Sequence, residues 1–186
     1  RWRTGVFTGG ANAVYYLERL ERLSETTSRY ANVVRRSKRA APEVAVELED
    51  ELVYEIVRGR DLRRWGLKGA GLLLCPHTVR SRMDAIAPEE MARSFPRTLE
   101  YLTSMRGILE DRKGFTSWES QFREAAFYVI QRVGDYTFAD YKVCWKYIAT
   151  DFIAAVVGPD TMGKPRLPND KVMSIATRSE EEAHYL

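Results

Sequence analysis

The chain has 186 residues, of which 45% are hydrophobic and 30% are charged, and its formal net charge is +3. This balance is typical of a globular protein with a hydrophobic core, and the length suits one domain or one domain with an appendage. No run approaches the roughly 18 consecutive apolar residues of a membrane helix, so we expect no membrane span, and no secretory signal is recognisable in the sequence.

The N-terminal fifth begins with a glycine turn, TGGAN at 8–12. Gly9 and Gly10 permit a tight turn with positive φ, and Asn12 can hold such a turn through its own backbone. The segment 14–23 suits either a helix or a strand, because leucines recur at three-residue spacing while VYYL is β-prone. We favour two strands joined by the polar turn SETTSRY, the second strand being YANVV.

Charges between residues 29 and 68 alternate in blocks. Residues 29–39 hold five basic residues and no acid, residues 43–55 hold six acids and no base, and residues 58–68 hold five bases beside Asp61. Such blocks can fold into a basic face opposite an acidic one, and a basic face attracts phosphates. The alternative is solvated surface charge without a partner, and alternating acids on a strand are usually a solvated face.

The middle of the chain mixes short elements. LVYEIV at 52–57 predicts a strand, residues 60–65 a helical turn closed by a glycine, and GLLLCP at 71–76 a buried strand. A short helix is expected at 88–94, and the clearest helix runs from Pro96 to Lys113, with apolar residues at three-and-four spacing. Residues 117–128 fit another helix.

Three strands and a final helix are expected towards the C-terminus. The strand candidates are 142–148, 152–157 and 171–176, separated by turns, and SEEEAHYL at 179–186 starts a helix. Strands and helices are interspersed without a regular βαβ rhythm. The fold class is therefore α+β, a mixed β-sheet with the long helix at about 96–113 packed on it.

Catalytic signatures are missing from the sequence. It holds no GxGxxG motif, P-loop or GxSxG elbow. Cys75 and Cys144 lie in apolar stretches and are expected to be buried free thiols in a reducing cytoplasm, whereas a zinc site would need both to meet His77 and His184. We expect no catalytic centre, bound cofactor or metal in this chain, although a metal-dependent nuclease using carboxylates of 47–55 is one alternative.

Several segments resemble, in order, the target-recognition (TaqI-like specificity) domain of N6-adenine DNA methyltransferases and related type II restriction–modification enzymes. TGVFTGGANAVYYL is similar to the phrase that opens that domain, with Thr8, Gly9 and Asn12 at its motif positions. Further segments with matching motifs are VRGRDLRRW (57–65), SFPRTLEYLTSMRGILEDR (94–112), DYKVCWKYIATDFIAAVV (140–157) and LPNDKVMSI (167–175).

The resemblance implies a DNA-binding domain over residues 1–186 of a longer cytoplasmic protein acting in restriction–modification or defence. In that family an S-adenosylmethionine-dependent catalytic domain with an NPPY-like motif precedes the recognition domain, so we expect such a domain upstream of Arg1. The expected partners are double-stranded DNA and that catalytic domain, with no membrane. The five segments occur in the family's order and are spread over almost the whole chain.

Basic side chains are the candidates for fixing the DNA register and reading base edges. Thr8, Asn12 and Lys142 are added through their motif positions, although turn chemistry alone would explain the first two. The candidate DNA-binding residues are Thr8, Asn12, Arg35, Arg36, Lys38, Arg39, Arg58, Arg60, Arg63, Arg64, Lys142 and Lys146.

Three questions stay open at this point. Asp61 either repels phosphate or holds a neighbouring arginine in an ion pair. The tryptophans Trp65 and Trp118, with the aromatic residues at 122, 127 and 128, favour packing over base stacking. The rival to DNA recognition is a protein-interaction module of a defence complex, which would expose an apolar stripe on the helix at 96–113.

Overall fold

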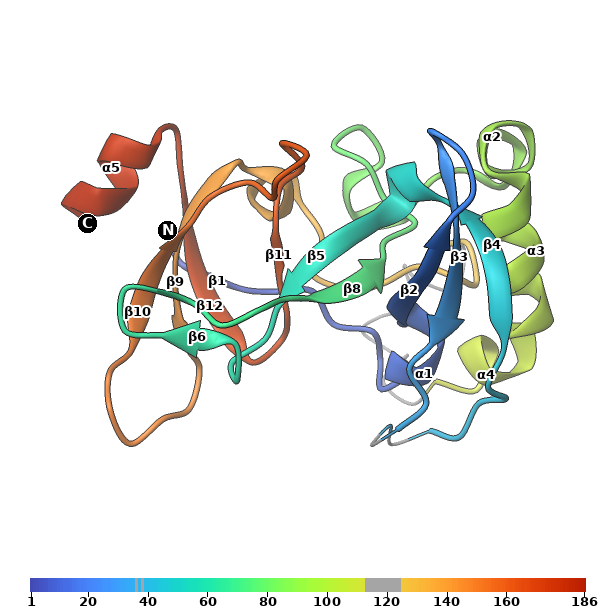
Figure 1. Ribbon diagram of the computed structural model, residues 1–186, viewed down its shortest axis with the longest axis horizontal. Coiled ribbons are helices and arrows are strands. Elements are labelled where there is room, and N and C mark those ends of the chain that lie inside the picture. The colour runs from blue at the N-terminus through green and yellow to red at the C-terminus, as the bar shows by residue number, and fades with distance from the viewer. Residues whose placement is uncertain (36, 38, 113–124) are drawn as a thin grey trace. The chain divides into compact units, whose positions relative to one another are not determined.

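The computed structural model describes residues 1–35, 37, 39–112 and 125–186 (Figure 1). Short helices and mixed sheets alternate along the chain, which confirms the predicted α+β class. The chain divides into two compact units. We call them the terminal unit, formed by Arg1–Phe7, Tyr54–Gly71 and Arg132–Leu186, and the central unit, formed by Thr8–Val53 and Leu72–Gln131.

The central unit contains antiparallel strands in the order β8-β2-β3-β4, and three α-helices follow them in the chain. In Figure 1, β2, β3 and β4 lie side by side and α3 packs against β4. Its elements are α1 (Asn12–Tyr15), β2 (Tyr16–Arg22), β3 (Thr27–Asn32), β4 (Ala45–Glu49), η1 (Asp50–Leu52), β8 (Gly71–Leu74), η2 (Arg82–Asp84), α2 (Pro88–Ser94), α3 (Pro96–Ser104) and α4 (Arg106–Glu110).

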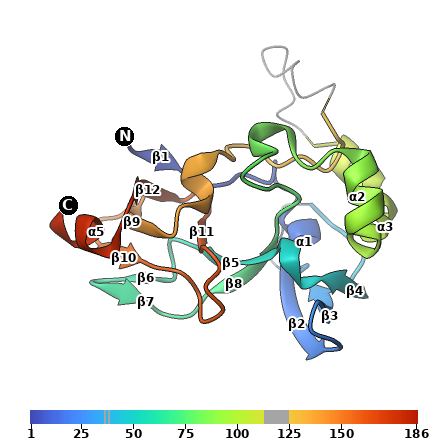
Figure 2. The ribbon, with the colours of Figure 1, turned by 90° about the horizontal axis from the view of Figure 1, so that it is seen from above.

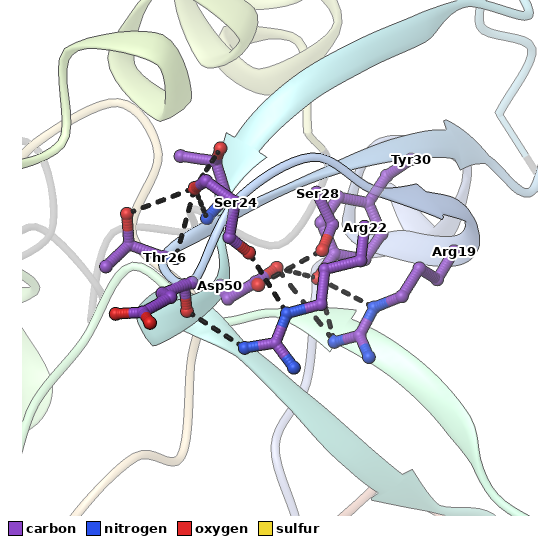
Figure 3. A network of polar contacts seen from close by, with 9 residues as sticks. Arg19, Arg22, Ser24, Thr26, Ser28, Tyr30 and Asp50 are labelled. Atoms are coloured by element: carbon purple, nitrogen blue, oxygen red, sulfur yellow. Dashed lines mark hydrogen bonds and ion pairs between the residues drawn. The ribbon is translucent and has the colours of Figure 1, made fainter.

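The β2–β3 hairpin confirms the predicted pair of strands, and a polar network holds it to the start of η1 (Figure 3). Tyr30 and Ser28 donate hydrogen bonds to the two carboxylate oxygens of Asp50, at 2.5 and 3.0 Å. Arg19 donates to the Tyr30 hydroxyl, and Arg22 donates to carbonyls of the hairpin turn. Burial raises the pKa of Tyr30 to about 12, further above neutral pH than its ordinary value.

The acidic segment that joins β4 to η1 is not simply a solvated face, because Glu49 is buried at the start of α3. Its carboxylate accepts from the backbone N–H groups of Arg97 and Thr98 and from the Thr98 hydroxyl, at 3.1, 2.9 and 2.6 Å. These N–H groups lack partners within their own helix, so a carboxylate from another element satisfies them. Glu49 thus anchors α3 to β4.

The helix predicted at 96–113 is interrupted. Met105 leaves the helical region at φ −98° and ψ 7°, so α3 ends at Ser104 and α4 begins at Arg106, with Met105 between them. Thr103 and Ser104 donate their hydroxyls to carbonyls three or four residues back, which competes with the regular helical pattern. The predicted helix at 88–94 is confirmed as α2, whereas residues 125–128 are not helical and residues 117–124 lie outside the described part.

Buried tyrosines cross-link the central core through backbone carbonyls. Tyr15 donates to the carbonyl of Tyr128, Tyr128 to that of Ile86, and Tyr101 to that of Val14, each at 2.7 Å. A buried phenol needs such a partner to avoid the cost of an unsatisfied hydroxyl. Segments distant in sequence are thereby fixed to one core.

The terminal unit is built around an antiparallel sheet in the order β1-β12-β9-β10, and β11 pairs in parallel with β5. The three strands predicted near the C-terminus and the final helix are confirmed, and Ser179 caps that helix by accepting from Glu182 N–H. The elements are β1 (Arg3–Thr4), β5 (Val53–Val57), β6 (Leu62–Arg63), β7 (Gly66–Leu67), η4 (Asp135–Phe138), β9 (Tyr141–Lys146), β10 (Ala154–Val157), β11 (Leu167–Pro168), β12 (Val172–Thr177) and α5 (Glu180–Tyr185).

The helical turn predicted at residues 60–65 is wrong, because residues 62–67 form the β6–β7 hairpin. Leu62 pairs with Leu67 and Arg63 with Gly66, and the hairpin lies beside β10 (Figure 2). Leu62 is fully buried with residues of β5, β9, β10 and β12. Burial of this leucine in the sheet's core overrides the local helical preference.

Candidate nucleic-acid interface

The predicted DNA-binding residues divide between the two units. Arg36 and Lys38 lie outside the described residues. The central unit holds Thr8, Asn12, Arg35 and Arg39, and the terminal unit holds Arg58, Arg60, Arg63, Arg64, Lys142 and Lys146.

The glycine turn at 8–12 is built into the central core. Gly9 and Gly10 have φ values of 69° and 86°, as predicted. Thr8 is buried, and its hydroxyl donates to the Asn12 side-chain oxygen at 2.5 Å. A Cβ at Gly9 would lie 3.0 Å from the buried Arg112 side chain. The contacts of Thr8 and Asn12 therefore fit turn chemistry, the structural alternative considered above.

Of the two described candidates in the basic segment at 29–39, Arg35 is an exposed cation and Arg39 is not. Arg39 forms an ion pair with Asp111 at 3.0 Å, and its own side chain is largely covered. Arg35 is exposed. Because the Arg39 side chain is largely covered as well as paired with Asp111, we do not count Arg39 as a phosphate contact.

Asp61 resolves one of the open questions, since it holds Arg58 in place. Its carboxylate accepts from the Arg58 guanidinium at 2.7 and 3.1 Å and from the Arg58 backbone N–H at 2.9 Å. Gly71 leaves room for this guanidinium, since a Cβ there would lie 2.7 Å from Nη1. The pair is a bidentate structural contact that fixes the start of the β5–β6 connection.

Lys142 corrects the prediction made from its motif position. Its side chain is fully buried in β9 and donates to the Ala139 carbonyl. Burial lowers the pKa of Lys142 to about 8. A phosphate on the surface of this unit cannot reach the ammonium, so Lys142 does not belong to the candidate interface.

Three cations from separate segments surround a hollow in the terminal unit. The hollow has a volume of about 280 Å³ and is lined by Gly59, Arg60, Lys146, Ile148 and Lys171. Arg60 follows β5, Lys146 ends β9, and Lys171 precedes β12. Arg60 is exposed and Lys146 is partly exposed.

Backbone pairing explains why these segments meet. Val172 pairs with Lys146 across the sheet, and Tyr147 N–H donates to the Lys171 carbonyl at 3.0 Å. Asn169 N–H donates to the Val57 carbonyl at 2.9 Å, which brings the turn before β12 beside the end of β5. The side chain of Asn169 also accepts from Lys171 N–H, so the turn that carries Lys171 is fixed.

The charge around the hollow is predominantly positive. Lys171 forms an ion pair with Asp170 at 2.9 Å but keeps 70% of its side chain exposed. Within the described residues, no acidic side chain lies in an ion pair with Arg60 or Lys146. Guanidinium and ammonium groups at one concave surface can bind the oxygens of a phosphate.

Exposed aromatic and apolar side chains belong to the same unit. Trp65 is 82% exposed at the tip of the β6–β7 hairpin, so it does not pack in the core of its unit, whereas packing against another domain stays a prediction. Tyr147, Ile148 and Phe152, in the β9–β10 connection, are also exposed. Arg63 donates to the Arg60 carbonyl at 2.7 Å, which links this hairpin to the Arg60 turn.

Other chemistry-bearing residues have structural roles. His77 is buried; its Nδ1–H donates to the Arg82 carbonyl at 2.7 Å and its Nε2 accepts from Ile130 N–H at 2.9 Å. Cys75 and Cys144 are buried free thiols, as predicted. In the described part of the chain, no group of three histidine, cysteine or acidic residues is arranged to hold a metal ion.

No protein-family model matches the chain, and no curated protein matches it. The described residues contain no helix that is both long and apolar enough to cross a membrane.

Sequence reasoning missed Lys171 and Trp65 as parts of the candidate interface. Lys171 lies next to the acidic Asp170 in the sequence and outside the basic blocks. Trp65 has apolar neighbours in the sequence, which favoured a buried position.

Proposed function

We propose that this chain binds double-stranded DNA as the target-recognition part of a cytoplasmic N6-adenine DNA methyltransferase. The observation that carries the proposal is the meeting of Arg60, Lys146 and Lys171 around one hollow in the terminal unit. The five ordered motif segments support the methyltransferase class. In this proposal the three cations neutralise backbone phosphates and fix the register, while exposed Arg63 and Arg64 are the nearest candidates for base edges.

The two rival functions receive less support from the contacts. An interaction module needs an exposed apolar stripe on α3 and α4, the two helices that replace the one predicted at 96–113. Leu102, Met105 and Leu109 are instead buried within the central unit. A nuclease needs available carboxylates, but Glu49 and Asp50 are engaged in the bonds described above. DNA recognition is therefore the function that we retain.

Fluorescence anisotropy of a labelled duplex, titrated with the chain at several salt concentrations, tests DNA binding. Affinity should fall as salt rises, because cations that bind phosphates release counterions. Replacing a phosphate-contacting cation, as in Lys146→Gln or Lys171→Gln, should weaken binding to all duplexes and reduce the salt slope by about 1.

Arg178→Gln is a matched control in the same unit. Arg178 is exposed and follows the far end of β12 from Lys171, seven residues away or roughly 20 Å along an extended strand. Its replacement should leave the slope unchanged. Absence of duplex binding at low salt, or equal losses for Arg178→Gln and Lys171→Gln, would contradict the proposal.

The methyltransferase class has its own test. The coding sequence upstream of Arg1 should encode an NPPY-type motif within an S-adenosylmethionine-binding domain. An unrelated upstream sequence would refute the class while leaving DNA binding to be judged by the titration.

A further inference from the structure

Trp65 is the feature of the terminal unit that its fold does not explain. The indole is 82% exposed, although tryptophan is on average a highly buried residue. Its ring therefore contributes little to the unit's hydrophobic core. A large aromatic side chain held in solvent is more typical of a binding surface.

The backbone at Trp65 strengthens this point. Its φ of 68° lies in the left-handed region, which a bulky non-glycine residue rarely adopts. Glycine or asparagine would fit there with less strain. An exposed side chain at a strained position, kept in place of a residue that would relax it, indicates a functional constraint.

The hairpin holds this residue firmly. Trp65 N–H donates to the Ala154 carbonyl at 3.2 Å, and the pairs Leu62–Leu67 and Arg63–Gly66 close the hairpin beneath it. Ala154 pairs with Trp145 in β9, and the next residue in β9 is Lys146 of the hollow. The ring is thus carried on a fixed element beside β10, which pairs with the strand that supplies one of the three cations.

Charge decides which partner this ring suits. The Arg64 guanidinium lies 5.8 Å from the ring centroid, and Arg63 bonds to the backbone of Arg60 at the hollow. The Trp65 ring and its neighbouring cations suit a partner that carries both negative charges and aromatic rings. Nucleic acid has that chemistry, since phosphates meet the cations and bases stack on the ring.

We propose that Trp65 stacks on a nucleobase that has left the duplex stack, next to the phosphates bound at the Arg60, Lys146 and Lys171 hollow. This inference rests on the proposed DNA binding and specifies what the same surface recognises. It predicts a preference for duplexes with an unstacked base.

The experiment uses the full chain with two labelled duplexes, one continuous and one carrying a single unpaired adenine or 2-aminopurine. The wild type should bind the bulged duplex about tenfold more tightly, the range expected for one base stacked on an aromatic side chain. Trp65→Asn removes the ring and suits the positive φ, so it should abolish the preference. Trp65→Phe should retain part of it.

Trp2→Asn is the matched control, because Trp2 is also exposed, at 62%, in the terminal unit. It should keep the preference and the quenching of 2-aminopurine fluorescence that wild-type binding produces. The melting temperature of Trp65→Asn and Trp65→Gly should equal or exceed that of the wild type.

Each other outcome overturns the inference. Salt-dependent binding of both duplexes without a preference refutes stacking and leaves the proposed DNA binding intact, whereas no binding of either duplex refutes both. A lower melting temperature in both Trp65→Asn and Trp65→Gly, or an equal loss of preference in Trp2→Asn, assigns Trp65 a structural role.

Discussion

In the central unit, Arg112 is buried and donates to the carbonyls of Leu109, Val129 and Phe127, each at 2.7 Å. In the terminal unit, Arg60 is exposed at the edge of a hollow that it shares with two lysines. An arginine is therefore a buried hydrogen-bond donor in the central unit and a solvent-exposed cation in the terminal unit. The contrast shows that an arginine in the sequence does not by itself mark a binding surface.

Both units also bury a base whose pKa falls for the same reason. Burial lowers the pKa of His77 to about 4 in the central unit and that of Lys142 to about 8 in the terminal unit. At neutral pH the first is uncharged and the second still carries its proton. Each residue should therefore make stability rise with pH, His77 in the acidic range and Lys142 in the alkaline range.

The largest effect is expected at Arg112. Arg112→Met should lower the free energy of unfolding by about 4 kcal/mol, because it leaves several buried carbonyls without a donor. Arg112→Lys should also destabilise, since an ammonium cannot reproduce the spread of the guanidinium bonds. Urea denaturation measures both, and the exposed Arg93→Met serves as control, with a change within about 0.5 kcal/mol. Equal effects of Arg112→Met and Arg93→Met would remove the contrast between the units.

A pH titration of stability tests His77. The unfolded histidine binds a proton below about pH 6.5 while the folded one does not until about pH 4, so stability should fall as pH drops through that window. The loss between pH 7.5 and pH 5 should be about 2 kcal/mol. His77→Gln should be less stable at pH 7.5 and should lose less on acidification. An unchanged pH slope in this variant would show that another group causes the loss.

Lys142 should show the same trend at alkaline pH. Because its folded pKa is about 8 and its ordinary value is 10.5, the unfolded state holds more protons between these values and stability should rise with pH. The gain from pH 7.5 to pH 9 should be about 1 kcal/mol. Lys142→Met should flatten this rise, which thermal unfolding at the two pH values would detect. A variant that keeps the full rise would place its origin in another residue.

The smallest change in stability is expected at the hollow. Lys146→Gln should alter the free energy of unfolding by no more than about 0.5 kcal/mol, because its side chain is not enclosed by the core. The same preparation should show the reduced salt slope of DNA binding. A large destabilisation would instead make Lys146 a structural residue like Arg112. Cations in the two units would then no longer differ in their contribution to stability.

Local sequence patterns were sufficient for many elements of the fold. Apolar spacing and flanking turns predicted α2, the strands β9, β10 and β12, and α5 at nearly their observed bounds, and the β2–β3 hairpin with its second strand placed about three residues too late. Patterns failed at Leu62, where burial among distant strands prevailed. They also failed at the break after Ser104, where local hydroxyl bonds compete with the helical pattern. The candidate site was predictable only in part. Arg60 and Lys146 were among the DNA-binding residues predicted from the sequence, and Lys171 was not.

The sequence alone determined the α+β class, the positive φ at Gly9 and Gly10, and the burial of both thiols. These features depend on local backbone freedom and on the periodicity of apolar residues. Tertiary structure alone decided that Lys142 is buried, that Trp65 is exposed, and that Lys171 joins Arg60 and Lys146. The physical reason is that exposure and proximity depend on strand pairing between distant segments, which determines what covers each side chain.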